Sequence, residues 1–238
     1  MLLALLTACA SEGPRDDGST SAGSFARVVN DSSATLVLVG PDEWLDDDED
    51  GWDLDCDADV AIDLDGDALV ISGNGDACTV RVRTGDVHEV ECDGDGDLDH
   101  DGDLRDISHI TLNGNGNVRL HRLDTDVLDL DVGGNGFVAI DDLRAHLLRL
   151  DLTGSSDVQL GGIVAKAEMS ITGNGNLDAR ELVLQDLFID MTGSGTATVT
   201  VEHSIDGEIG GNGTLDVYGN PEGTVDVSGS GQLTFHDD

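Results

Sequence analysis

Residues 128–140 read LDLDVGGNGFVAI, and this stretch decides the fold. Apolar and polar side chains alternate before the tripeptide Gly134-Asn135-Gly136, and Val138 and Ile140 continue the alternation after it. Period-two alternation is typical of a half-buried β-strand, because successive side chains point to opposite faces. Glycine tolerates positive φ, and asparagine tolerates it better than most residues. The stretch therefore predicts two strands joined by a tight turn.

The same pattern recurs along the chain with a nearly constant period. Nine Gly-x-Gly-like tripeptides follow one another, and their first glycines are 21, 20, 20, 20, 19, 20, 18 and 18 residues apart. The residue two positions before each first glycine is apolar, from Ile71 to Val227. One such unit cannot bury its apolar residues alone, so the units must stack. We therefore predict an all-β, right-handed parallel β-helix-like solenoid with about nine coils of 18–21 residues. The first glycines are Gly73, Gly94, Gly114, Gly134, Gly154, Gly173, Gly193, Gly211 and Gly229.

Composition agrees with a narrow stacked core and limits the partners. Aromatic residues make up only 3% of the 238 residues, whereas 32 are glycine. Stacked Val, Ile and Leu fill a solenoid without large aromatic side chains. The 50 acidic and 11 basic residues give a net charge of −39, which repels nucleic acid and anionic lipid. We expect neither as a partner.

The N-terminus predicts export and lipid anchoring. Residues 1–9, MLLALLTAC, are an apolar run that resembles a bacterial lipoprotein signal peptide, with Cys9 as the lipidated lipobox cysteine. The run is too short to span a membrane and lacks a basic leader, so we expect the true start to lie upstream. Residues 10–24 are small and polar and predict a disordered tether. The alternative is an incidental apolar N-terminus. We expect a lipid anchor in the bacterial cell envelope.

Residues 110–235 resemble the head GIN domain family, labelled putative auto-transporter adhesin. The resemblance rests on serial Ile/Val-x-Gly-Ser/Asn-Gly motifs and on the closing stretch 215–221, LDVYGNP, followed by VSGSG at 227–231. It implies a secreted, right-handed β-helix-like solenoid on a bacterial envelope, without catalytic residues. We treat 25–238 as one domain with an acidic insertion at about 41–57. Phe25–Gly40, which contains the strand-like stretch Ala34–Val39, would then supply the opening strands.

Two acidic segments are candidates for calcium binding. In the first, four aspartates occupy positions 1, 3, 5 and 12 of an EF-hand-like loop, with Gly51 at the turn position. The second, residues 93–103, places Asp97, Asp99 and Asp101 similarly but has Ser108 at the last position. The helices of an EF-hand are absent from the sequence around the first segment. A solvated acidic surface without specific ion sites is the alternative. The four aspartates of the first segment are Asp46, Asp48, Asp50 and Asp57.

Cysteine and histidine positions carry weaker signals. Cys56 and Cys78 lie about one repeat apart, so adjacent coils would bring them together as a disulfide. Cys92 falls in an apolar column and predicts a buried thiol. The seven histidines, including His100 and His109, lack the spacing of a zinc site, and we expect them to be exposed to solvent.

These features favour a non-enzymatic surface protein. Few bases are present to abstract a proton from an acidic sugar, and no nucleophile elbow occurs. Phe137 and Phe188 fall at outward positions, where they could contact an unknown envelope protein or glycan, and Trp44 and Trp52 could cap the solenoid. We therefore expect a lipid-anchored module for adhesion or protein–protein interaction. The alternatives are a structural or calcium-binding acidic surface protein and, more remotely, a carbohydrate-active β-helix enzyme.

Overall fold

The computed structural model describes residues 25–40, 52–55, 60–74 and 78–236. Within these residues the chain forms eighteen β-strands and no helix. The strands are β1 (Arg27–Ser32), β2 (Thr35–Val39), β3 (Trp52–Asp55), β4 (Val60–Asp65), β5 (Ala68–Gly73), β6 (Thr79–Arg83), β7 (Glu89–Cys92), β8 (Leu98–Arg105), β9 (His109–Leu112), β10 (Asn117–Asp124), β11 (Val127–Val132), β12 (Phe137–Leu152), β13 (Asp157–Ile171), β14 (Asn176–Met191), β15 (Thr196–Ile209), β16 (Thr214–Tyr218), β17 (Glu222–Val227) and β18 (Gln232–His236).

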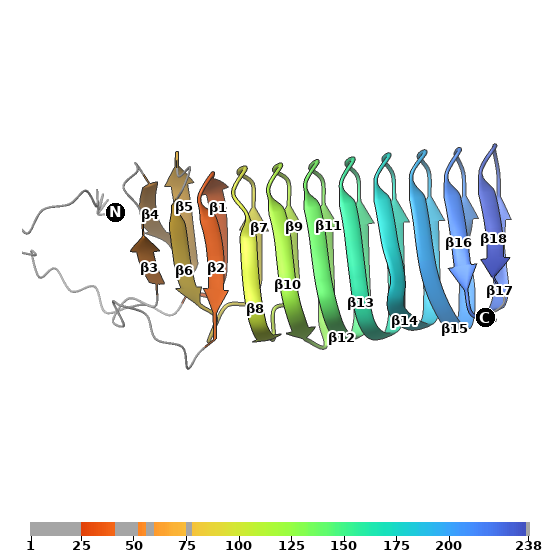
Figure 1. Ribbon diagram of the computed structural model, residues 1–238, viewed down its shortest axis with the longest axis horizontal. Coiled ribbons are helices and arrows are strands. Elements are labelled where there is room, and N and C mark those ends of the chain that lie inside the picture. The colour runs from red at the N-terminus through yellow and green to blue at the C-terminus, as the bar shows by residue number, and fades with distance from the viewer. Residues whose placement is uncertain (1–24, 41–51, 56–59, 75–77, 237–238) are drawn as a thin grey trace, which may run out of the picture.

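The strands stack into a flattened parallel β-solenoid, as the sequence period predicts (Figure 1). Each coil has one strand before the Gly-x-Gly-type turn and one strand after it, and we call the two resulting sides the pre-turn face and the post-turn face. The long strands β12 to β15 run through the wide bend at the opposite edge. Their first residues therefore belong to the post-turn face and their last residues to the pre-turn face.

A narrow apolar core fills the space between the two faces. In-register pairing places Val138, Val158, Leu177 and Ala197 in one column, and each is at most 1% exposed. Such stacking removes every second side chain of a strand from water, which is the main source of stability in repeat proteins of this kind. The intervening polar residues consequently point outward and form the surface of both faces.

The opening strands do not form the first coil. β1 pairs in parallel with both β5 and β7, and β2 pairs with both β6 and β8. Residues 27–39 are therefore inserted between the coil of Gly73 and the coil of Gly94. The order of the strands in the stack therefore departs from their order in the chain at this point. The chain winds regularly only from β7 to β18, and the solenoid has about seven turns instead of the predicted nine coils.

The turn glycines are needed for close packing more than for positive φ. Among the described turn glycines only Gly73 and Gly229 have a positive φ. A Cβ atom at Gly114 would lie 1.6 Å from the carbonyl oxygen of Gly94, and one at Gly134 would lie 1.7 Å from that of Gly114. The sequence prediction identified the turn residues, but it gave the wrong reason for most of them.

Stacked side chains of the turns also form a hydrogen-bonded ladder. Asn135 Nδ2 donates to Asn115 Oδ1 at 3.0 Å, and Asn115 Nδ2 donates to Asp95 Oδ1 at 2.7 Å. In-register amide ladders of this type add hydrogen bonds along the stack.

The two ends of the described stack differ. At the N-terminal end, β3 pairs with β6 and β4 pairs with β5, both antiparallel, and Trp52 packs against the core. This agrees with the predicted capping role of Trp52, whereas Trp44 lies outside the described residues. At the other end, Val227 and Phe235 occupy core columns of the last coil but are 45% and 49% exposed.

Candidate functional site

Outward side chains of the pre-turn face lie in rows that cross the strands. Because the strands pair in register, residues at equivalent positions of β9, β11, β12, β13 and β14 are neighbours at about 4.8 Å spacing. Two such rows lie two residues apart along each strand. The first row contains His109, Asp129, Arg149, Glu168 and Phe188, and the second contains Thr111, Asp131, Asp151, Ser170 and Asp190.

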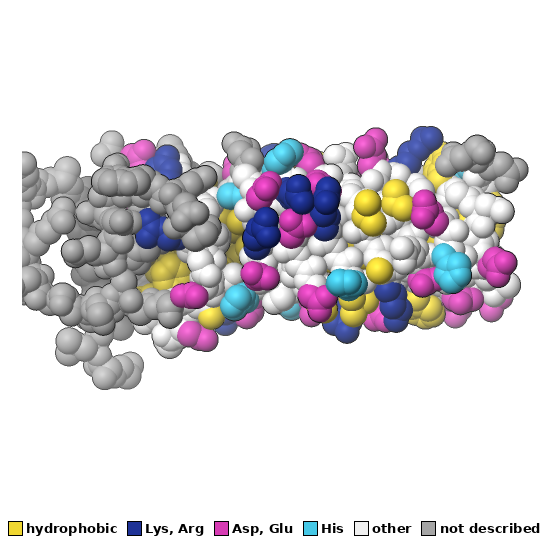
Figure 2. All heavy atoms as spheres, turned by 90° about the horizontal axis from the view of Figure 1, so that it is seen from below, with side chains coloured by type: hydrophobic (Ala, Val, Ile, Leu, Met, Phe, Trp, Pro, Cys, Tyr) yellow, Lys and Arg dark blue, Asp and Glu magenta, His cyan; other side chains and the backbone are white. Residues whose placement is uncertain are grey.

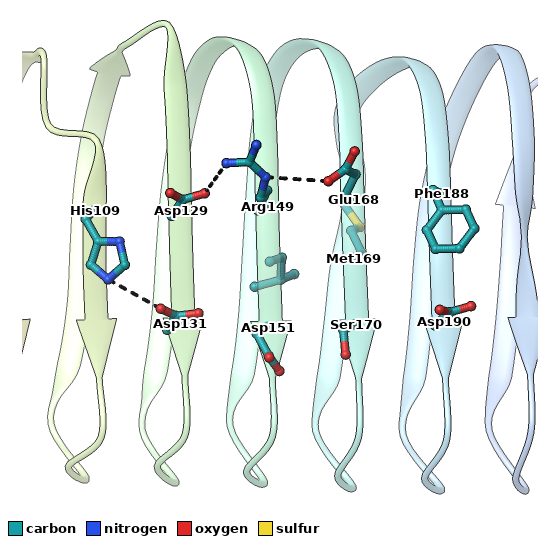
Figure 3. A pocket seen from close by; sticks show the side chains of 11 residues that line it. His109, Asp129, Asp131, Arg149, Asp151, Glu168, Met169, Ser170, Phe188 and Asp190 are labelled. Carbon is teal, nitrogen blue, oxygen red and sulfur yellow. Dashed lines mark hydrogen bonds and ion pairs between the residues drawn. The ribbon is translucent and has the colours of Figure 1, made fainter.

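A surface pocket of about 670 Å³ lies over these two rows (Figure 3). Most side chains of both rows line it, and the inward-pointing residues Leu150 and Met169 contribute to its floor. The lining combines carboxylates, a guanidinium, a hydroxyl and an aromatic ring. We take this pocket as the candidate functional site.

Ion pairs hold most of the first row in place. Arg149 lies between two acidic neighbours, with Nη1 3.0 Å from Asp129 Oδ1 and Nε 3.5 Å from Glu168 Oε2. Lys166 Nζ lies 2.5 Å from Glu168 Oε1, and its hydrogen bond is the main cause that lowers the pKa of Glu168. The hydrogen bond to Asp129 raises the pKa of Arg149. These groups are exposed, so the pairs contribute more to side-chain order than to stability.

The second row leaves acidic groups without partners. His109 Nε2 lies 3.3 Å from Asp131 Oδ2. Asp151 and Asp190 are exposed, and within the described part of the chain neither forms an ion pair or side-chain hydrogen bond. The pocket is therefore open, acidic and partly apolar. Such a lining suits noncovalent recognition of a partner that brings positive charge.

A smaller pocket of about 310 Å³ lies near the wide bend and includes His100. The prediction that the histidines are exposed is wrong for His100, which is 5% exposed. It occupies the core column that Leu120 fills in the next coil, and its Nδ1 lies 2.5 Å from the carbonyl oxygen of Leu38. Its position six residues after Gly94 was the sequence signal for burial.

The wide-bend edge carries a patch of arginines among aspartates (Figure 2). Arg122 lies 3.1 Å from Asp124 and 3.7 Å from Asp142, and Arg144 lies 3.2 Å from Asp142. The hydrogen bond to Asp142 raises the pKa of Arg144. The opposite charges alternate along and across the strands, so the arginines and aspartates of this patch pair with one another.

The predicted calcium residues Asp46, Asp48, Asp50 and Asp57 lie outside the described residues, and so does Cys9. In the second segment, Asp97 accepts hydrogen bonds from the backbone N and Nδ2 of Asn117, and Arg119 lies 3.5 Å from Asp99. These carboxylates bind the next coil. In the described ranges no group of three or more His, Cys, Asp or Glu residues could hold a metal ion.

The cysteines agree with the sequence where they are described. Cys92 is a free, buried thiol, as predicted. Cys78 is disulfide-bonded. Cys56 lies outside the described residues, so its pairing with Cys78 stays a prediction. No helix long and apolar enough to cross a membrane is found among the residues that the structure describes.

The fold and the pocket define a parallel β-solenoid with a surface pocket on its pre-turn face. A family model described as "Putative auto-transporter adhesin, head GIN domain" matches residues 55–221, more than half of the chain. The chain belongs to this family. The match begins well before residue 110, where the motif resemblance begins, and it ends before the last Ser-Gly-Ser-Gly motif.

Solved structures share the fold at low sequence identity. A putative adhesin from Parabacteroides distasonis is 16% identical with a TM-score of 0.73, covering 91% of this chain and 94% of that chain. A putative adhesin from Bacteroides fragilis is 20% identical with a TM-score of 0.64 and the same coverage. A putative lipid binding protein from Parabacteroides distasonis is 19% identical with a TM-score of 0.75, covering 89% and 92%. No curated protein sequence matches.

Proposed function

We propose that this protein is a non-enzymatic adhesion module of the bacterial cell envelope that binds its partner on the pre-turn face. The family and the putative adhesins among the structural neighbours support an adhesion role. The observation that carries the choice of face is the pocket of about 670 Å³ across five neighbouring strands. A rigid solenoid holds these side chains at fixed spacing, which lowers the entropy lost on binding.

Surface binding by variants of the two faces tests this proposal. Ser170→Tyr places a bulky ring inside the pocket, and Thr198→Tyr places the same ring on the post-turn face. Both side chains are outward and half-buried, so both variants should fold. We expect Ser170→Tyr to lose most binding to intact cells or envelope fractions, whereas Thr198→Tyr keeps it. Equal binding by both variants would contradict the choice of face.

We further propose that lipidated Cys9 anchors the protein to the membrane through the tether at 10–24. The motif at residues 6–9, Leu-Thr-Ala-Cys, supports this step. The Cys9→Ser variant should move from the membrane fraction to the soluble fraction on cell fractionation. A variant that stays with the membrane would exclude this anchor, without affecting the proposal for the binding face.

A further inference from the structure

Along the first row of the pre-turn face, the charges alternate in sign until an uncharged aromatic residue interrupts them. Asp129, Arg149 and Glu168 follow one another on neighbouring strands. The next residue in the row is Phe188, and the one after it is Asp206. Two carboxylates therefore flank an aromatic ring at a position where the alternation would place a cation. Asp190, two residues after Phe188 on β14, is a third carboxylate on the same side of the strand.

The Phe188 ring is available to a partner. The residue is 45% exposed, and Figure 3 shows the ring lying with one face turned toward the viewer, outside the solenoid. Asp190 and Asp206 are exposed, and neither has an ion-pair or hydrogen-bond partner among the side chains that the structure describes. Glu168, in contrast, is engaged by Arg149 and Lys166.

Two other outward aromatic rings of this solenoid contact arginine side chains of the protein itself. The Arg180 guanidinium lies over the Tyr218 ring, 4.1 Å from its centroid, and the Arg119 guanidinium lies 6.0 Å from the centroid of Phe137. Within the described residues no cation lies over Phe188. A guanidinium can stack on an aromatic face and also donate hydrogen bonds to carboxylates at the ring edge.

We infer that Phe188, Asp190 and Asp206 form a receptor for an arginine side chain of a partner polypeptide. This inference rests on the proposed function, because it assigns a partner chemistry to the same face. Arginine fits better than lysine, since its planar group both stacks on the ring and bonds a carboxylate in a forked geometry. The other carboxylate of the pocket without a partner, Asp151, attracts further basic residues of the same polypeptide.

Peptide binding by the full chain carrying Cys9→Ser tests the receptor. The probe is a fluorescein-labelled tetra-arginine peptide, compared with a tetra-lysine peptide of equal length and charge by fluorescence anisotropy at physiological salt. We expect the arginine peptide to bind several-fold more tightly. Phe188→Ala changes no charge and should weaken arginine binding about two- to five-fold, whereas Phe188→Trp should retain it.

A charge-matched pair of double variants distinguishes peptide binding at the receptor from a general attraction of the basic peptide to an acidic protein. Asp190→Asn with Asp206→Asn removes two charges beside the ring. Asp157→Asn with Asp178→Asn removes two exposed charges on the post-turn face. We expect the first pair to weaken arginine binding severalfold more than the second, with similar thermal unfolding in both.

Two results would overturn the receptor: equal binding by Phe188→Ala and the parent chain, or equal losses in the two double variants. The proposed function fails separately. If Ser170→Tyr abolishes surface binding while Phe188→Ala does not alter peptide binding, the face is used but its partner is not an arginine-bearing polypeptide. If Phe188→Ala weakens peptide binding while Ser170→Tyr leaves surface binding intact, the receptor stands and the adhesive role of this face does not.

Discussion

Gly134 illustrates how single residues set the spacing of the coils. A Cβ atom there would lie 1.7 Å from the carbonyl oxygen of Gly114 in the preceding coil, far inside van der Waals contact. Gly210 is a useful contrast, because its nearest contact would be Thr192 Cγ2 at 3.5 Å, an ordinary distance. Neither glycine has a positive φ. Alanine variants at the two positions therefore distinguish the effect of close packing on stability from the effect of backbone conformation.

Gly134→Ala should destabilise the fold strongly, by about 3 kcal/mol or more, because backbone atoms cannot relax as a flexible side chain does. Gly210→Ala should change the free energy of unfolding by less than about 1 kcal/mol. Urea denaturation of both variants measures the difference. Similar losses in the two variants would mean that close packing at the turn is not the constraint.

Cys92 should be chemically inert in the native protein. Burial raises the pKa of its thiol to about 12, so the reactive thiolate is scarce at pH 8. Since the unfolded thiol has a pKa of about 8.5, this shift favours the folded state below that pH and the gain is lost as pH rises toward 12.

A thiol-reactive dye counts the accessible cysteines of the Cys9→Ser chain. No thiol should react in the native protein, and one should react after denaturation without reductant if Cys56 pairs with Cys78. Three reactive thiols after denaturation would contradict the disulfide, and one in the native protein would contradict the burial of Cys92.

Among the elements, the pair β1 and β2 has the most unusual position. The sequence period located every Gly-x-Gly turn and nearly every buried column, because side-chain alternation is a local property of each strand. It did not reveal that residues 27–39 lie between the coils of Gly73 and Gly94. Parallel pairing joins residues far apart in the chain, and equivalent apolar columns accept one another in any order.

The candidate site was predictable only in part, for a related reason. Phe188 was identified as an outward residue from alternation within β14 alone. The row itself follows from the repeat, because each of its members lies five residues before the first glycine of its coil. The sequence does not show which of these side chains pair with one another and which leave a pocket open between them.

Asn30 should be a main determinant of the interleaved coil. It is 1% exposed and lies between Ile71 and Cys92 in the stack. Its Nδ2 donates to the carbonyl oxygen of Ala34 at 2.9 Å, and its Oδ1 accepts from Ser32 Oγ at 2.6 Å. These bonds hold the turn between β1 and β2, the only coil whose turn lacks glycine among those described.

Asn30→Ala should therefore lower the free energy of unfolding by about 1–3 kcal/mol, because it leaves buried polar groups without partners. The neighbouring Asp31 is exposed, and Asp31→Ala should change stability by no more than about 0.5 kcal/mol. Chemical denaturation compares the two. Equal stability of both variants would show that burial of Asn30 does not anchor this coil.

At the scale of the whole molecule, parallel stacking turns a high net charge into rows of like charges. Asp131 and Asp151 are direct neighbours across strands, and Asp190, Glu208 and Asp226 follow one another in the same row. Like charges directly opposite one another destabilise a sheet, and the net charge of −39 adds a general repulsion. The solenoid tolerates this because its apolar columns are continuous.

Salt should consequently stabilise the protein. Screening shortens the Debye length from about 30 Å at 0.01 M to about 8 Å at 0.15 M, so the melting temperature should rise by about 2–4 °C for each kcal/mol of repulsion relieved.

A comparison of salts tests whether this effect is screening alone. At matched ionic strength, we expect the shift in melting temperature to depend only on the charge of the cation, so that calcium chloride and magnesium chloride give the same shift and sodium chloride gives a different one. A larger shift with calcium than with magnesium would instead show a specific ion site, since a ligand that binds only the folded state stabilises it. Loss of that excess in a variant with Asp46→Asn, Asp48→Asn and Asp50→Asn would then assign the site to the acidic segment, and acidity would be a binding feature of the protein.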